Sequence, residues 1–416
     1  MHASENIIGQ KWIRIALINL CIVALLGVIM RYKIAWSLPF IEQENILHAH
    51  YHFAFSGWVT QSLMTLMIAS LAIGNGENFF KKYNWLLLAN LIFAYAMLFS
   101  FIWAGFNVIS IAASTFSILI SYLFAIIYWK DLNKIKIKSV SSYWFKAALV
   151  FNILSSFGAF FLSYLMMNKI SHLNWYLAST YYFLHFQYNG WFFFTCMGLF
   201  STRLAAAGIQ NKFQKKIFIV FAGACIPAFF LSALWLPIPT WVYVLVVVAA
   251  LAQLWAWVIF IKKIIANKLS FFEGIKAQAK WILILSGAAL SIKLLLQAGS
   301  TIPSLSKIAF GFRPVVIGYL HLVLLGVITL FILGYSKINH LISTNRIGNA
   351  GVAIFISGII LNELLLMVQG ISYMNYVALR YINELLLGAA ICMFTGVLLL
   401  ILGLSKQGIS TRNDLY

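Results

Sequence analysis

The stretch of sequence that determines the fold is LHAHYHFAFSGW, residues 47–58. Its last histidine, His52, has a glycine five residues later, and the same spacing recurs at His185 and at His321. Nearly equal lengths of chain separate the three histidines. A motif that recurs at a fixed period indicates internal repeats. The sequence therefore predicts three copies of one structural unit, each of which presents a histidine.

The composition of the chain predicts a membrane protein. Hydrophobic residues make up 63% of the sequence and charged residues 9%, which is too little polar surface to cover a water-soluble globule of this length. The net charge of +20 does not indicate nucleic acid, because the basic residues lie in short loops between apolar runs. The four cysteines lie within apolar runs and lack the spacing of a zinc or redox motif. We predict an all-α polytopic membrane protein whose partner is the lipid bilayer and not nucleic acid.

The apolar runs divide the chain into twelve segments that are long enough to cross a bilayer as helices. No stretch is left for a sizeable soluble domain, so we predict a single transmembrane domain over residues 1–416. Three repeats in twelve helices predict three pseudo-symmetric arcs of four helices each. The predicted spans are residues 12–31, 46–73, 84–104, 107–129, 143–167, 174–200, 214–236, 239–266, 279–298, 314–335, 349–373 and 382–405.

The distribution of basic residues predicts the orientation. Most of the 29 lysines and arginines lie in the connections on the side that holds both termini, and basic loops face the cytoplasm. We therefore expect both termini to be cytoplasmic and the protein to be integral to the cell (inner) membrane. His52, His185 and His321 then fall on the second, sixth and tenth spans, all in the outer half of the membrane.

Histidine within a membrane span favours a cofactor. An ionisable residue at this depth indicates function, and a neutral imidazole offers one nitrogen to haem iron or copper while the other donates a hydrogen bond. The glycine five residues later would let a neighbouring helix or a flat macrocycle come close. The alternative is that each histidine only bonds to another helix. Three symmetric positions favour the cofactor.

Residues 318–326, GYLHLVLLG, resemble the helix-10 segment of nitric oxide reductases and C-type oxidases. These enzymes belong to the haem-copper oxidase superfamily, whose main subunit has twelve helices in pseudo-threefold arcs. The resemblance implies that His321 is an axial ligand of a low-spin haem, which we expect to be b-type. The opposite ligand would come from the second span, where His52 is the first candidate and His48, on the same helix face, is the alternative.

The sequence also departs from this family. Tyr319 stands where the family has the histidine of its high-spin haem, and residues 214–236 lack the histidine pair of its copper site. The standard binuclear centre is therefore incomplete, and the sequence assigns no catalytic residue. A copper ion or second haem held by His50, His185 and Tyr319 is a hypothesis. Arg380 lies in an outer connection where the family places arginines on haem propionates.

The predicted function is that of a haem-binding membrane protein with a redox role or a role in nitric oxide or oxygen handling, similar to haem-copper oxidases or to NnrS-like proteins. Whether it is an oxidoreductase enzyme stays open, as does association with respiratory or cytochrome subunits. One alternative is a twelve-helix transporter, since internal symmetry also describes carriers. The other is a non-catalytic assembly partner of a respiratory complex.

Three further polar residues lie within predicted spans. Lys293 and Gln297 are one turn apart on the ninth span, and Glu363 lies on the eleventh. Charged groups in a membrane either pair with one another or handle protons. Both interpretations are open at this stage.

Overall fold

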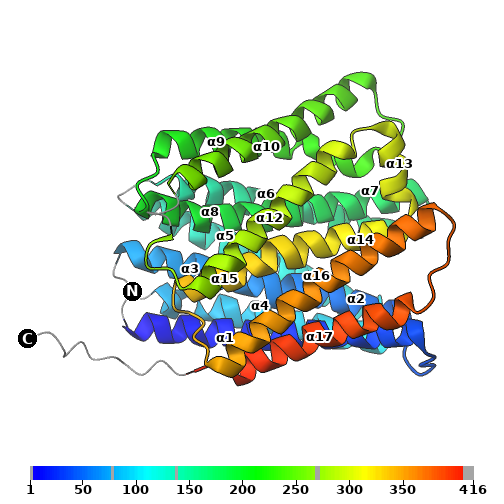
Figure 1. Ribbon diagram of the computed structural model, residues 1–416, viewed down its shortest axis with the longest axis horizontal. Coiled ribbons are helices and arrows are strands. Elements are labelled where there is room, and N and C mark those ends of the chain that lie inside the picture. The colour runs from blue at the N-terminus through cyan, green and yellow to red at the C-terminus, as the bar shows by residue number, and fades with distance from the viewer. Residues whose placement is uncertain (1–2, 76–78, 136–138, 268–271, 406–416) are drawn as a thin grey trace, which may run out of the picture. The chain divides into compact units, whose positions relative to one another are not determined.

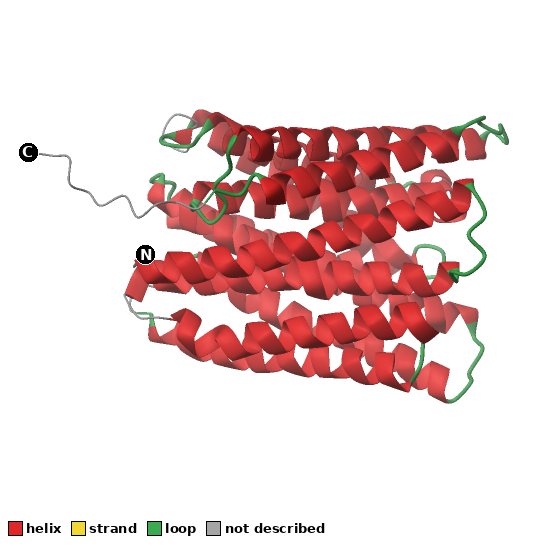
Figure 2. Ribbon diagram, turned by 90° about the horizontal axis from the view of Figure 1, so that it is seen from below, coloured by secondary structure: helices red, strands yellow, loops and turns green. Residues whose placement is uncertain are grey.

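Helices make up nearly all of the protein. The computed structural model describes residues 3–75, 79–135, 139–267 and 272–405, and within these ranges the chain forms helices joined by loops, with no strand (Figures 1 and 2). The helices of the first half are α1 (Ala3–Ala35), α2 (Gln43–Phe53), η1 (Ala54–Thr60), α3 (Gln61–Asn75), α4 (Phe79–Ala104), α5 (Val108–Lys134), α6 (Ser141–Met167), α7 (Leu173–Leu184), η2 (His185–Phe192) and α8 (Phe193–Ala206).

The second half continues in the same way. It contains α9 (Asn211–Cys225), η3 (Pro227–Ala233), α10 (Thr240–Ala266), α12 (Ala277–Gly299), α13 (Pro303–Gly311), α14 (Arg313–His321), η4 (Leu322–Thr329), α15 (Leu330–Ile338), α16 (Arg346–Met374) and α17 (Ile382–Leu402). Helix covers most of each predicted range, although residues 214–236 form two short helices with a bend between them. The short helix α13 was not predicted, because its nine residues are too few to produce a span-length apolar run.

Ten helices in the described ranges are long and apolar enough to cross a membrane. A further pair, α9 and η3, meets the same criteria together but bends by 45°, at Ile226 just before Pro227, whose missing N–H cannot continue the helix. The helix formed by α7, η2 and α8 is not among the ten, because polar residues such as His185, Gln187 and Asn189 lower its hydropathy. An integral membrane protein with many apolar helices is therefore confirmed.

Contacts group the chain into two compact units. Unit 1 comprises residues 1–117, 335–365 and 380–416, and unit 2 comprises residues 118–334 and 366–379. The motif around His52 lies in unit 1, whereas the motifs around His185 and His321 lie in unit 2. The span that carries the His52 motif, Gln43–Leu71, is 89% buried. The other nine of the ten spans are 28 to 44% buried. The first histidine motif therefore lies on the most enclosed of these spans.

Close backbone packing joins α16 to α17 within unit 1. A Cβ atom on Gly396 would lie 2.7 Å from the Cα atom of Phe355, and one on Gly351 would lie 2.7 Å from the carbonyl oxygen of Gly396. Small residues allow membrane helices to approach in this way. The glycines are required here because the space that a side chain would occupy is filled by backbone.

This packing predicts that Gly396→Ala destabilises the protein by about 1–3 kcal/mol, the usual cost of overpacking. Thermal unfolding of the detergent-solubilised protein measures the effect. Gly388→Ala, in the same helix, is the matched control, because a Cβ there meets nothing within 4 Å. The control should be neutral or slightly stabilising, since alanine favours helix over glycine. Equal behaviour of the two variants would contradict this account of the packing.

Candidate functional site

All three histidine motifs form π-helix. The segment η1 begins two residues after His52, η2 begins at His185, and η4 begins one residue after His321. π-Helical turns are rare, usually short, and frequent at functional sites. The three motifs that the sequence repeats thus share a backbone conformation that few residues adopt, which supports the prediction of three related units.

Side chains from neighbouring helices donate hydrogen bonds to backbone carbonyl groups of the π-helices η1 and η4. In unit 1, the amide of Asn19 on α1 donates to the Gly57 carbonyl at 2.6 Å, and Asn90 on α4 donates to the Ser56 carbonyl at 3.1 Å. In unit 2, the Ser286 hydroxyl donates to the Val327 carbonyl at 2.8 Å. Irregular helix within a membrane is tolerated where neighbouring side chains satisfy its backbone. These contacts hold the π-helical turns η1 and η4 in place.

The Asn19 and Asn90 side chains belong to a larger buried network in unit 1. The Tyr95 hydroxyl donates to the Asn19 side-chain oxygen at 2.9 Å, and the Asn90 amide also donates to the Gln61 side-chain oxygen at 2.7 Å. Sequence reasoning missed these residues. The available signal was a set of isolated polar residues within apolar runs, but their partners lie on other helices.

Protein atoms fill the space beside each motif glycine. A Cβ atom on Gly57 would meet the Phe53 ring, one on Gly190 would lie 2.6 Å from Cβ of Phe151 on α6, and one on Gly326 would lie 3.1 Å from Cβ of Ala289 on α12. The glycines of the second and third motifs therefore serve close helix packing, which was one of the two predicted roles.

The middle histidine, His185, has both ring nitrogens in hydrogen bonds. Its Nε2 donates to the Cys225 carbonyl at 2.8 Å, and its Nδ1 accepts from the Asn189 amide at 3.1 Å. The α-helix α9 ends at Cys225, where the chain bends into η3. His185 thus bonds to the backbone at the break, with no lone pair left for a metal ion in this arrangement.

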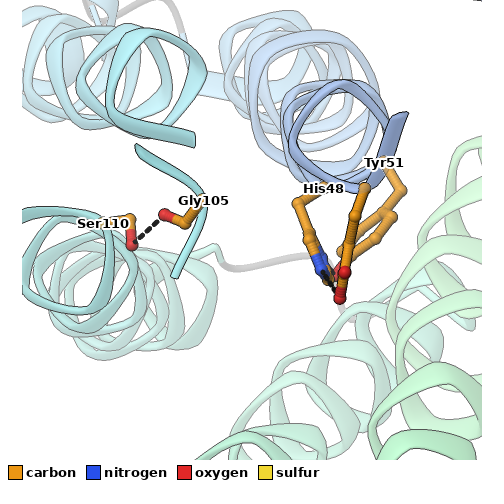
Figure 3. Close-up of polar contacts among 5 residues, drawn as sticks. His48, Tyr51, Gly105 and Ser110 are labelled. Atoms are coloured by element: carbon orange, nitrogen blue, oxygen red, sulfur yellow. Dashed lines mark hydrogen bonds and ion pairs between the residues drawn. The ribbon is translucent and has the colours of Figure 1, made fainter. Parts of the chain in front are cut away.

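The first motif contains three histidines with different partners. His48 contacts the Tyr51 hydroxyl through Nδ1 (Figure 3) and Glu44 through Nε2, at 3.5 Å. His50 donates through Nδ1 to the Val23 carbonyl at 3.1 Å. Among the described residues, neither ring nitrogen of His52 has a hydrogen-bond partner. Of the two candidate ligands on this helix face, His52 has the free lone pair and His48 does not.

Aromatic rings hold the imidazole of His52. Phe101 on α4 stacks on it with a centroid separation of 4.4 Å and an interplanar angle of 9°, and Phe106 presents its edge at 6.4 Å. Phe106 follows Gly105, whose φ of 58° lies in the left-handed region. The Ser110 hydroxyl donates to the Gly105 carbonyl at 3.0 Å (Figure 3), and Asn107 caps α5 by accepting from the Ser110 N–H at 3.0 Å. The turn that carries Phe106 is therefore well defined.

The remaining predicted residues lie as follows. His321 is half-buried and ends α14 immediately before η4. Tyr319 lies near Tyr188 of η2, with ring centroids 6.4 Å apart. Arg380 is exposed before α17, and its guanidinium lies 4.6 Å from the ring centroid of Tyr381. Nothing in this arrangement assigns a catalytic role to any of them.

The three residues predicted to hold copper do not all belong to one unit. His50 lies in unit 1, whereas His185 and Tyr319 lie in unit 2. Outside the undescribed segments, no group of three or more His, Cys, Asp or Glu residues could hold a metal ion. Because both nitrogens of His185 already have partners, neither is free for a copper ion in this arrangement.

Comparison with known protein families and with curated proteins gives no match to this chain.

The hydrogen bonds to η1 generate a prediction. Asn19→Leu removes the donor to the Gly57 carbonyl and the acceptor of the Tyr95 hydroxyl, and leaving buried polar groups without partners costs about 1–3 kcal/mol each. We expect a clear fall in thermal stability, measured in detergent. Asn168→Leu is the control, because this asparagine is exposed and its side chain bonds only within its own helix end, to the Tyr164 carbonyl. Unchanged stability of the Asn19 variant would show that the π-helix does not depend on this donor.

Proposed function

We propose that the protein is a haem-binding integral membrane protein of the haem-copper oxidase type, with His52 and His321 as the axial ligands. The observation that carries this proposal is the coincidence of the repeated histidine motif with π-helix in three separate spans. The pairing of the two histidines on one iron comes from their positions on the second and tenth spans and from the family that the sequence resembles.

The donor chemistry of the first ligand fits a haem. His52 offers an imidazole whose nitrogens have no partner among the described residues, next to the apolar rings of Phe101 and Phe106. Neutral imidazole is a common axial ligand of haem iron. A haem would supply one-electron redox chemistry or the binding of a diatomic gas. Arg380 is exposed and available to a propionate, which favours the role that the resemblance suggests.

The topology in this proposal has twelve spans in three arcs of four. Its support is the sum of the ten apolar helices, the bent pair of α9 and η3, and the continuous helix that runs from Leu173 to Ala206. The predominance of basic residues on one side supports cytoplasmic termini in an inner membrane. Cytochrome or other respiratory subunits are the natural electron partners of such a protein.

We place the copper ion outside the proposal. The engaged nitrogens of His185 argue against the standard oxygen-reducing centre, so the proposed role is electron transfer or the handling of nitric oxide or oxygen by a haem alone.

This proposal predicts that the protein purified from haem-replete cells shows a Soret band and a reduced-minus-oxidised alpha band. His52→Ala and His321→Ala should each abolish or strongly shift these bands, because each removes an axial ligand. Visible spectroscopy and a pyridine haemochrome assay measure the effect and identify the haem.

Two variants serve as controls. His48→Ala and His172→Ala should keep the bands, because His48 is already bonded to Tyr51 and Glu44 and His172 is exposed. A colourless preparation would overturn the proposal and favour the transporter or the assembly partner. Loss of the bands in His48→Ala but not in His52→Ala would exchange the two ligand assignments.

A further inference from the structure

A buried polar stripe runs along one face of α12 in unit 2. Lys293, Gln297 and Thr301, which follows the helix end, are spaced one turn apart and are only 6, 7 and 8% exposed. Leu295 and Leu296, between these turns, are 58 and 51% exposed. At this end of α12, polar side chains therefore face the interior of the unit, although the rest of the buried face is mostly apolar.

Lys293 has no acidic partner in its unit. The acidic residues of unit 2 are Asp131, which lies 3.5 Å from Lys134, and Glu273, which precedes the first turn of α12. At the opposite end, Lys293 lies six residues from Gly299, about 9 Å at 1.5 Å per residue. Burying an ammonium without a counter-charge is costly. The acidic residue of the predicted ion pair, Glu363, lies in unit 1, so within unit 2 the Lys293 ammonium has no carboxylate partner.

The groups around Lys293 come from several elements. Its Nζ lies 5.9 Å from the ring centroid of Phe193 on α8, and it interacts electrostatically with the Cys225 thiol and the His185 imidazole. The segment η4, which packs against α12, carries no titratable residue. The other packed helix, α10, carries Lys262 and Lys263 in its last turns and Tyr243 at its start. None of these is an anion at neutral pH.

Two polar groups on the stripe lack partners within the described chain. The Lys293 ammonium makes no hydrogen bond or ion pair in unit 2, and the Gln297 side-chain oxygen is buried without a donor. A bound anion would satisfy the first group but not the second. Water satisfies both, because it donates to the amide oxygen and accepts from the ammonium.

We propose that Lys293 is a proton-exchange site which water reaches from the Gly299 end of α12 along Gln297 and Thr301. The Tyr243 hydroxyl donates to the Thr301 carbonyl at 2.6 Å and fixes the entrance end of the stripe. The bond that changes is an N–H bond of Lys293, which forms or breaks as a water molecule gives or takes the proton. The site is independent of the proposed haem.

Cysteine accessibility tests the water path. In the full-length protein in nanodiscs, which expose both faces, Thr301→Cys, Gln297→Cys and Lys293→Cys should react with a cationic methanethiosulfonate in that order of decreasing rate. Each should react at least about tenfold faster than Leu296→Cys, because thiols react as hydrated thiolates. Mass spectrometry resolves each position, so the four native cysteines stay in place. Reaction at 297 as slow as at 296 would overturn the proposal.

A second measurement tests proton exchange. In the Gln297→Cys variant, position 297 is labelled with an anionic reagent and, separately, with a cationic one. The ratio of the anionic to the cationic labelling rate reports the charge of Lys293, because the ionisation of the thiol affects both rates equally. This ratio should fall as the pH rises and Lys293 loses its proton, because the neutral amine no longer attracts the anionic reagent. It should be flat in the double variant that combines Gln297→Cys with Lys293→Gln. A ratio that favours the anionic reagent and does not change with pH would overturn the proposal and indicate a permanent anion site.

Discussion

The structure depends on one constraint, which is that every backbone polar group within a bilayer needs a partner inside the protein. Ordinary helices meet this constraint by themselves. The π-helical turns η1, η2 and η4 disturb the regular pairing, and the protein meets the constraint with side chains from other helices. Asn19 and Asn90 bond to η1, and Ser286 bonds to η4. Burying such a polar side chain in an apolar span costs free energy unless it forms a hydrogen bond. Their own helices do not need these donors, so their presence indicates that they stabilise the π-helical turns.

The histidine side chains also need polar partners, and they differ in which partners they have. In the second motif, His185 bonds to the Cys225 carbonyl where α9 ends and to Asn189 one turn along. In the first motif, His48 has Tyr51 and Glu44, whereas His52 lies between aromatic rings without a polar partner among the described residues. The histidines of the repeated motif thus have different partners. His185 bonds to the backbone at a helix break, and His52 has no hydrogen-bond partner among the described residues.

Unit 2 shows a further consequence of the low polarity around the helices. A charged residue in such a place requires compensation, and ion pairs are the commonest form of it. Neither of the acidic residues of unit 2, Asp131 and Glu273, forms an ion pair with Lys293. The polar neighbours on its own helix, Gln297 and Thr301, lead toward the nearer helix end, which is why hydration accounts for the stripe better than a fixed counter-ion.

Much of the fold could be predicted from the sequence. The apolar runs located the helices, because the length needed to cross a bilayer is a local property, and the repeated spacing after His52, His185 and His321 located the motifs. The bend between α9 and η3 carried a local signal in Pro227. The π-helical turns carried none, because over seven or eight residues their pattern of apolar residues does not differ from that of an α-helix.

The sequence by itself therefore determined the class of protein, the places of its helices and the set of candidate histidines. Only the tertiary structure showed that His48 is hydrogen-bonded whereas His52 has no such partner among the described residues, and that the nitrogens of His185 bond to Cys225 and Asn189. The physical reason is that the availability of a nitrogen lone pair depends on hydrogen-bond partners, and many of these come from helices that lie far apart in the chain and meet only when it folds.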